Sequence, residues 1–206
     1  MAEILGHIYR RRSIRKFTSQ KVADEVIVSL LKAAMAAPSA TNARPWEFVV
    51  VTDEDRLKKL EANLPFGRHG APLMIVPLGN PALALNRAAQ KFWQQDLSAA
   101  TENILIAAAG MGLGGCWIGV YPIHWLVKRI SAVLGLPEGV FPLCVINLGY
   151  PATRKSPRTQ YDERRVHWQV YDQAKSEALH PKFFERAAAL LGVAWDYIRP
   201  LNKDKQ

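Results

Sequence analysis

Three arginines and one serine near the start of the chain have residue types and spacing that suit a phosphate group. They occupy the segment Arg11-Arg12-Ser13-Ile14-Arg15. In an extended chain, Arg11, Ser13 and Arg15 would lie on one side and Ile14 would anchor the other. Arginine binds phosphate oxygens through paired hydrogen bonds, and the serine hydroxyl adds another donor. The segment therefore predicts a phosphate-monoester site, unless it is a solvated basic helix end or an arm that binds nucleic acid.

A second pair of cations, Lys155 and Arg158, lies on either side of Pro157. The pair follows Leu148-Gly149-Tyr150-Pro151, where a predicted strand ends. It is a second candidate phosphate clamp, although only the fold could bring it to the first cluster. Taken by itself, the segment is more typical of a solvated basic loop.

Two further segments suit a flat ring rather than a phosphate. The loop Ser39–Pro45, bounded by Pro38 and Trp46, is stiffened by two prolines and offers several hydrogen-bonding side chains. It could hold the edge of a heteroaromatic ring, or it could be a capping turn before a strand. The run Gly112–Gly119 (GLGGCWIG) allows close approach of the backbone, whose N–H groups could bind ring atoms. The alternative is a glycine-rich turn from helix to strand.

The elements that must position these segments follow from hydrophobic periodicity. For example, Ile27, Leu30, Leu31 and Ala34 form the stripe of a core-facing helix, which Pro38 then stops. The predicted helices are Ala2–Arg11, Ala23–Met35, Asp53–Ala62, Ala82–Gln94, Leu97–Met111, His124–Leu134 and one after Pro181 in the tail. The predicted strands are Phe48–Val51, Leu73–Val76, Trp117–Tyr121 and Phe141–Leu148. This order predicts the α+β class, with one sheet covered by helices.

Composition limits the class of protein. The chain has 206 residues, of which 49% are hydrophobic, and its net charge is +9. These values fit one core and an anionic partner. No apolar run approaches the roughly 18 residues of a membrane span, and no secretory signal is visible. The two cysteines are expected to be buried reduced thiols in a cytoplasmic protein. The histidines show no metal-ligand spacing, so no metal site is expected, and neither a Rossmann fingerprint nor a Walker loop is present.

Taken together, the motifs resemble the nitroreductase family of FMN-dependent oxidoreductases. The resemblance covers roughly Ile8 to His167. It rests on RRSIR at 11–15, the pattern PSxxNxxPW at 38–46, GLGGCWIG at 112–119, LPEG at 136–139 and LGYP at 148–151. Each motif is weak alone, but five in this order and spacing are specific.

The resemblance implies a central, mainly antiparallel sheet in an intertwined homodimer, with FMN at the subunit interface. Pro38, Ser39, Ala40 and Asn42 would reach the flavin from the partner subunit. The residues near the phosphate and ribityl chain would be Arg11, Arg12, Ser13, Arg15, Lys155 and Arg158, and those along the isoalloxazine would be Trp117, Ile118 and Gly119. Arg44 and Ala40 depart from the family pattern, which has a glutamine and a hydroxyl there, so the hydrogen bonds at that ring edge are in doubt.

The implied activity is a ping-pong hydride transfer from NADH or NADPH to a flat, electron-poor acceptor such as a nitroaromatic or a quinone. No catalytic side chain is expected, because the flavin carries the chemistry. One alternative is a dedicated flavin reaction, such as dehalogenation or flavin fragmentation. Another is a basic dimeric module that binds nucleic acid without turnover. Residues 1–170 are expected to form the FMN-binding domain, and 171–206 a helical extension of it.

Overall fold

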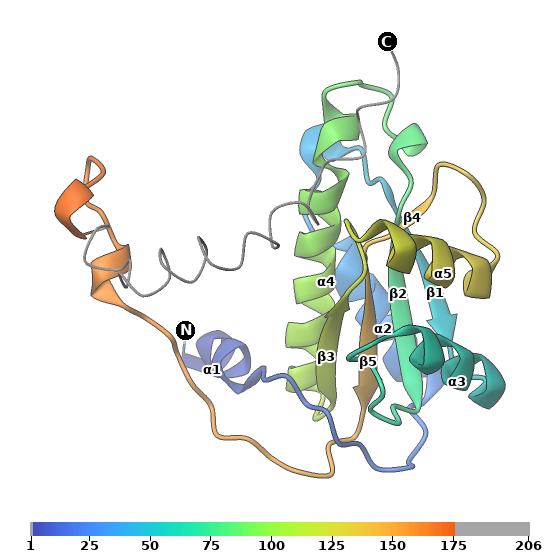
Figure 1. Cartoon of the computed structure of the whole chain (residues 1–206). Helices are drawn as coiled ribbons and strands as arrows, with labels where there is room; N and C mark the ends of the chain where they lie inside the picture. Colours follow the sequence, from blue (N-terminus) through green and yellow to red (C-terminus); the bar gives the residue numbers. More distant parts are fainter. Residues whose placement is uncertain (1, 176–206) are drawn as a thin grey trace, which may run out of the picture. The chain divides into compact units, whose positions relative to one another are not determined.

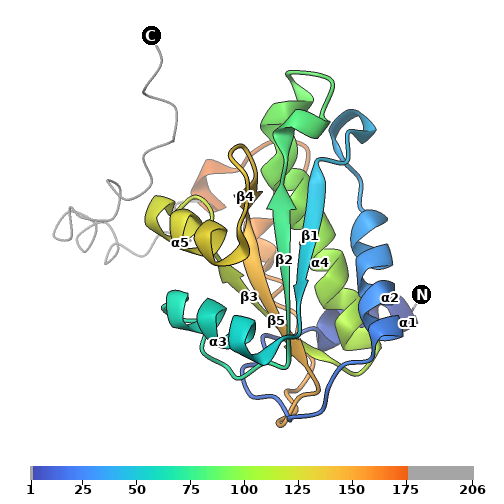
Figure 2. The ribbon, with the colours of Figure 1, turned by 90° about the vertical axis from the view of Figure 1, so that its right-hand side faces the viewer.

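The structure is a computed structural model that describes residues 2–175. It divides into two compact units, Met1–Pro157 and Arg158–Gln206. In the first unit, one sheet lies between two layers of helices (Figure 1). Figure 2 shows α2 and α4 on one face of this sheet and α3 and α5 on the other. The expected α+β class is therefore confirmed.

The sheet is antiparallel throughout. Its strand order is β1-β2-β5-β3, and the short β4 pairs with β2. The strands are β1 (Trp46–Val51), β2 (Leu73–Gly79), β3 (Gly114–Gly119), β4 (Phe141–Pro142) and β5 (Cys144–Gly149). The helices are α1 (Ala2–Arg10), α2 (Asp24–Met35), α3 (Glu54–Asn63), α4 (Trp93–Gly110) and α5 (His124–Leu134).

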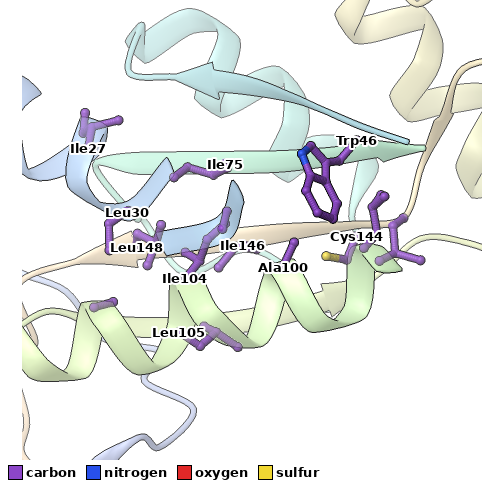
Figure 3. Packing of buried hydrophobic residues seen from close by; sticks show 14 of the residues in the cluster. Ile27, Leu30, Trp46, Ile75, Ala100, Ile104, Leu105, Cys144, Ile146 and Leu148 are labelled. Carbon is purple, nitrogen blue, oxygen red and sulfur yellow. The ribbon is translucent and has the colours of Figure 1, made fainter. Parts of the chain in front are cut away.

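Helix α4 is the central buried helix that its composition predicts. It packs between the sheet and α2, and residues such as Leu97, Ala100 and Ile104 are fully buried. Figure 3 shows α4 side chains meeting Ile146 and Leu148 of β5. A second core lies on the opposite face of the sheet, under α3 and α5. The sheet is thus buried on both faces.

The predicted helix over Ala82–Gln94 is wrong. The structure has only two short 3-10 turns there, Pro81–Leu83 and Ala89–Phe92, before α4 begins at Trp93. The side chain of Asn86 accepts a hydrogen bond from the N–H of Ala88 at 2.7 Å. Such local bonds compete with the helical ladder, and the apolar composition of the segment conceals this competition.

All four predicted strands differ from the structure in their bounds: β1 begins at Trp46 and β2 continues to Gly79, and the other two strands differ more. Strand β3 begins three residues before the predicted Trp117, because its glycines belong to the strand. The predicted strand Phe141–Leu148 is divided into β4 and β5 at Leu143, whose carbonyl accepts the N–H groups of both Val120 and Tyr121. Two residues facing one is the pattern of a β-bulge, with the extra residue here in the chain just after β3.

The second unit is described from Arg158 to Lys175. It contains the short turn Glu163–Arg165, capped by the side chain of Asp162. The ring of His167 stacks on that of Tyr171 with centroids 4.4 Å apart. The predicted helix after Pro181 lies outside the described residues, and the 170/171 boundary remains a prediction.

Both cysteines are free and buried, as expected. Burial raises the pKa of the Cys116 thiol, and it raises the pKa of Cys144 to about 12. In the part of the chain that the structure describes, no helix is both long and apolar enough to cross a bilayer.

The close contact between Gly79 and Trp93 yields a stability prediction. A Cβ at Gly79 would lie 2.1 Å from the Trp93 ring, which is itself wedged against Tyr121 at 4.8 Å between centroids. Gly79→Ala is therefore expected to lower the free energy of unfolding by about 1–3 kcal/mol, the usual cost of overpacking. The matched control is Gly119→Ala, since a Cβ there meets nothing within 4 Å. Urea denaturation measures the stability of both variants. Equal denaturation midpoints would contradict the close contact between Gly79 and Trp93.

Candidate functional site

The basic segment after α1 lies against the outer edge of β3. Ser13 forms a parallel bridge with Gly115, and the N–H of Ile14 donates to the carbonyl of Gly115 at 3.0 Å. The Ile14 side chain is buried, as predicted. Its place depends on Gly114, where a Cβ would lie 2.7 Å from the Cβ of Ile14. The glycines of β3 thus allow the segment to approach the sheet.

The structure brings the two predicted cationic segments together. The ammonium of Lys155 donates to the carbonyl of Ser13 at 2.9 Å, and the guanidinium of Arg12 donates to the carbonyl of Ser156. Beside these contacts, the N–H of Ala152 donates to the carbonyl of Lys16 at 3.0 Å. Arg158 is exposed and belongs to the second unit. Within the first unit, therefore, Lys155 is the member of the predicted pair that joins the arginine cluster.

A cavity of about 410 Å³ opens beside these contacts. Apolar residues such as Leu105 and Ala109 of α4 form part of its wall. Five cations also line it, and no acidic residue of the described chain does; they are Arg10, Arg11, Arg12, Arg154 and Lys155. Cations gathered around a hollow attract an anion and give it several donors.

Arg11 and Arg15 interact with different groups, although the sequence predicts that both side chains lie on the same side of an extended chain. The Nε of Arg11 forms an ion pair with Glu102 of α4 at 3.2 Å. Burial raises the pKa of Glu102, and the charge of Arg11 opposes that shift. Arg15 is exposed, and together with Lys155 it opposes the rise that burial causes in the pKa of Cys116. The segment pairs with the sheet only at Ser13, so strand alternation does not extend across it.

Beyond this contact, the edge of β3 presents its backbone. Because the carbonyl of Gly115 faces outward, antiparallel alternation places the backbone groups of Trp117 and Gly119 on the same edge. The side chains diverge: Trp117 packs toward α4, Ile118 is buried on the opposite face, and Gly119 is exposed. Trp117 and Gly119 can therefore offer a ligand their backbone groups, whereas the backbone groups of Ile118 face β5.

The loop between α2 and β1 has an unusual backbone. Thr41, Asn42 and Arg44 have φ angles of 51°, 55° and 49°, in the left-handed region that side chains disfavour. The hydroxyl of Ser39 accepts the N–H of Arg44 at 3.0 Å, and the Nε of Arg44 donates to the carbonyl of Asn42 at 3.3 Å. Pro38 and Asn42 are exposed, whereas Ser39 and Ala40 are half-buried. The loop is therefore an ordered structure, not a simple capping turn.

Sequence reasoning missed Asp96, in the first turn of α4. Its Oδ1 accepts the N–H of Ala40 at 3.0 Å, although its side chain belongs to a buried helix and the residue is only 6% exposed. Burial raises its pKa, and the bond from Ala40 opposes this. The sequence signal that could have identified Asp96 is its position as a single acidic residue just before the apolar stretch that begins at Leu97.

The loop and the cation-lined cavity lie at different ends of α4. Asp96 holds the loop near the start of the helix, while Leu105 and Ala109 line the cavity farther along. Nine residues of helix, from Asp96 to Leu105, span about 14 Å. Figures 1 and 2 show the 40–42 turn at the upper end of α4 and the chain that follows α1 at the lower end. One chain therefore holds the loop and the cavity at separate places along α4. The described residues contain no cluster of three or more metal-ligating side chains.

Comparison with known proteins connects this geometry to a family. The model of the nitroreductase family matches residues 8–64 and 63–150. A protein of Archaeoglobus fulgidus, provisionally named NADH dehydrogenase/NAD(P)H nitroreductase, is 45% identical over 75% of this chain and 89% of its own length.

Solved structures agree. A crystal structure from Parabacteroides distasonis with the same provisional name has a TM-score of 0.77 at 37% identity, and the match covers 82% of this chain and 99% of that one. An FMN-dependent nitroreductase of Clostridium difficile R20291 has a TM-score of 0.73 at 31% identity, over 81% of this chain and 99% of that one. The five motifs had predicted this relationship, and the chain belongs to the nitroreductase family.

Proposed function

We propose that the protein is a cytoplasmic FMN-dependent oxidoreductase that transfers hydride from NADH or NADPH to a flat, electron-poor acceptor such as a nitroaromatic or a quinone. The observation that carries the proposal is the cation-lined cavity at the edge of β3, beside a strand edge with outward backbone groups. A phosphate joined by a short polar chain to a flat heteroaromatic ring suits this combination. The name of the Clostridium difficile relative supports FMN as that molecule.

The residues present fit such a ligand. Arg12 and Lys155 each use part of their hydrogen-bonding capacity on a backbone carbonyl, and an arginine has five N–H groups in all. The remaining donors are assigned to the phosphate and ribityl chain, together with Ser13, Arg11 and Arg15. Of these three residues, Arg11 lines the cavity. Arg158 belongs to the second unit, and its expected role at the phosphate stays a prediction. The outward backbone groups of Trp117 and Gly119 are assigned to the ring, with Ile118 between them.

The other half of the site would come from a second copy of the chain. The loop residues Pro38, Ser39, Ala40 and Asn42 lie at the far end of α4 from the cavity of their own chain. In a homodimer with its site at the interface, they could contact the ring held by the partner. Helix α1 has the surface that such an assembly needs, because Ile4, Leu5, Ile8 and Tyr9 are all exposed.

In this proposal the chain's own groups bind and orient rather than react. When bound, FMN would supply the hydride chemistry. The cations and the strand edge would hold it with one ring face open, so that donor and acceptor occupy the same place in turn. Nearby positive charge would favour negative charge on the ring. No side chain is assigned as a general acid or base, because protons can come from solvent.

The first test is the absorption spectrum of the purified protein. We expect oxidised-flavin bands, either as isolated or after FMN is added and the excess is removed, and we expect NADH or NADPH to bleach them under anaerobic conditions. A protein that retains no FMN would contradict the proposal and favour a binding module without turnover. Acceptors added after anaerobic reduction would then separate a broad reductase from an enzyme with a dedicated flavin reaction.

The phosphate assignment is tested by Arg15→Ala combined with Lys155→Ala. Each lost charge-assisted contact should cost roughly 1.5–3 kcal/mol, so the Kd for FMN should rise by at least tenfold. Fluorescence titration of the apoprotein measures it. Lys128→Ala, an exposed cation on α5, is the control for loss of charge and should leave the Kd unchanged. Unchanged FMN affinity in the double variant would refute the phosphate clamp.

The two-chain site is tested through α1. Light scattering should give twice the mass of one chain for the unmodified protein. Ile4→Asp combined with Ile8→Asp places charges on the exposed apolar face of α1, so it should shift the protein toward monomer and weaken FMN binding with it. Phe66→Ser removes an exposed apolar side chain elsewhere and should change neither property. A monomeric variant that binds FMN like the unmodified protein would argue against a shared site.

A further inference from the structure

Asp96 is an exception in the buried part of the molecule. Among the described residues, the buried polar side chains besides the cysteines are Asp96, Thr101 and Asn147, and Asp96 is the only carboxylate. One of its oxygens, Oδ1, accepts the N–H of Ala40. The other, Oδ2, is buried and has no hydrogen-bond partner in the described structure. A buried carboxylate oxygen without a hydrogen bond lowers the stability of the fold, and an apolar residue at this position would avoid that loss.

The one bond that Asp96 makes reaches a backbone that needs support. The loop at 38–44 contains three non-glycine residues with left-handed φ angles, and such angles persist only where surrounding contacts enforce them. The bonds that Ser39 and Arg44 make lie within the loop itself. The bond between Ala40 and Asp96 instead joins the loop to a rigid helix. An ionised acceptor makes a stronger bond to an N–H group than a neutral one does.

A second side chain of α4 holds the end of α2, just before the loop at 38–44. The amide of Asn103 donates to the carbonyl of Ala33, in the last turn of α2, at 3.0 Å. Asp96 and Asn103 are seven residues apart, so two helical turns place them on one face of α4. The helix therefore holds the exit of α2 and the loop that follows at a set separation. This pairing places the loop relative to the core, not merely relative to its own ends.

We propose that Asp96 is a positioning residue that holds the loop at 38–44 in a preformed shape for its ligand, acting through the N–H of Ala40. The proposal rests on the proposed function, in which this loop contacts FMN held by the partner subunit. Asp96 itself does not touch the ligand. Its contribution is to remove the cost of ordering the loop when the ligand binds, because the left-handed backbone is already in place.

The experiment compares Asp96→Ala, which removes the acceptor, with Asp96→Asn, which keeps a neutral oxygen at the same position. Amide hydrogen exchange of a peptide covering residues 38–44 is measured in the apoprotein, and the Kd for FMN is measured by titration. We expect Asp96→Ala to accelerate exchange in the loop and to raise the Kd about tenfold or more. Asp96→Asn should rescue most of both effects, because its amide oxygen can still accept the N–H of Ala40. If the side chain acted only through its negative charge, Asp96→Asn would not rescue them.

Thr101→Val is the matched control. Thr101 is also a buried polar residue of α4, but its hydroxyl hydrogen-bonds the Sγ of Cys144 in β5, at 3.9 Å, rather than the loop. It should leave both loop exchange and the Kd for FMN unchanged. If Asp96→Ala does not fold, Asp96→Asn alone is compared with the unmodified protein, and a smaller increase in both quantities is still expected.

The outcomes separate this proposal from the function on which it rests. If the unmodified protein binds no FMN, the proposed function fails, and the exchange data still decide whether Asp96 holds the loop. If it binds FMN but Asp96→Ala matches it in loop exchange or in Kd, the positioning role is overturned. If only Asp96→Asn folds, an Asp96→Asn variant equal to the unmodified protein in both quantities overturns the role. Faster exchange throughout the molecule in Asp96→Ala would also overturn it, because that pattern indicates general destabilisation.

Discussion

The burial of α4 between the sheet and α2 is the constraint on which the rest of the molecule depends. Its small and aliphatic residues allow close packing against β5, and that packing fixes the axis of the helix. Both the loop at 38–44 and the cavity wall are positioned by this helix. Asp96 near its start holds the loop before β1, and Leu105 and Ala109 farther along form part of the cavity wall. A shift of α4 would therefore disturb the loop and the cavity together.

The cavity shows how like charges can be gathered in one place. Five cations around one hollow repel each other, and this repulsion opposes folding. The structure reduces the cost by giving several of them local acceptors: Glu102 for Arg11, and the carbonyls of Ser13 and Ser156 for Lys155 and Arg12. These bonds also fix the directions of the side chains. A phosphate would then meet donors that are already ordered, which lowers the entropic cost of binding.

Prediction from the sequence was accurate where one local pattern decides the outcome. Helix α5 has the predicted bounds, and Gly135 ends it with a left-handed φ of 65°. Asp53 caps α3 through the N–H of Arg56. Prediction from the sequence was inaccurate where local hydrogen bonds or distant packing compete with the hydrophobic pattern. The Asn86 side chain binds a backbone N–H within the predicted helix at 82–94 and competes with the helical ladder there. The break at Leu143 lies opposite the bulge at Val120 and Tyr121, a distant contact that no local signal reports.

For the candidate site, the sequence by itself determined which residue types are present and in what order, and this was enough to identify the family. It also determined that Ile14 would be buried and that the β3 glycines would lie in close contact with a neighbour. Only the tertiary structure decided that Lys155 meets Ser13, that Arg11 pairs with Glu102 and that Asp96 holds Ala40. The physical reason is sequence distance. Each of these contacts joins segments separated by more than fifty residues, and their meeting depends on how the sheet and α4 pack.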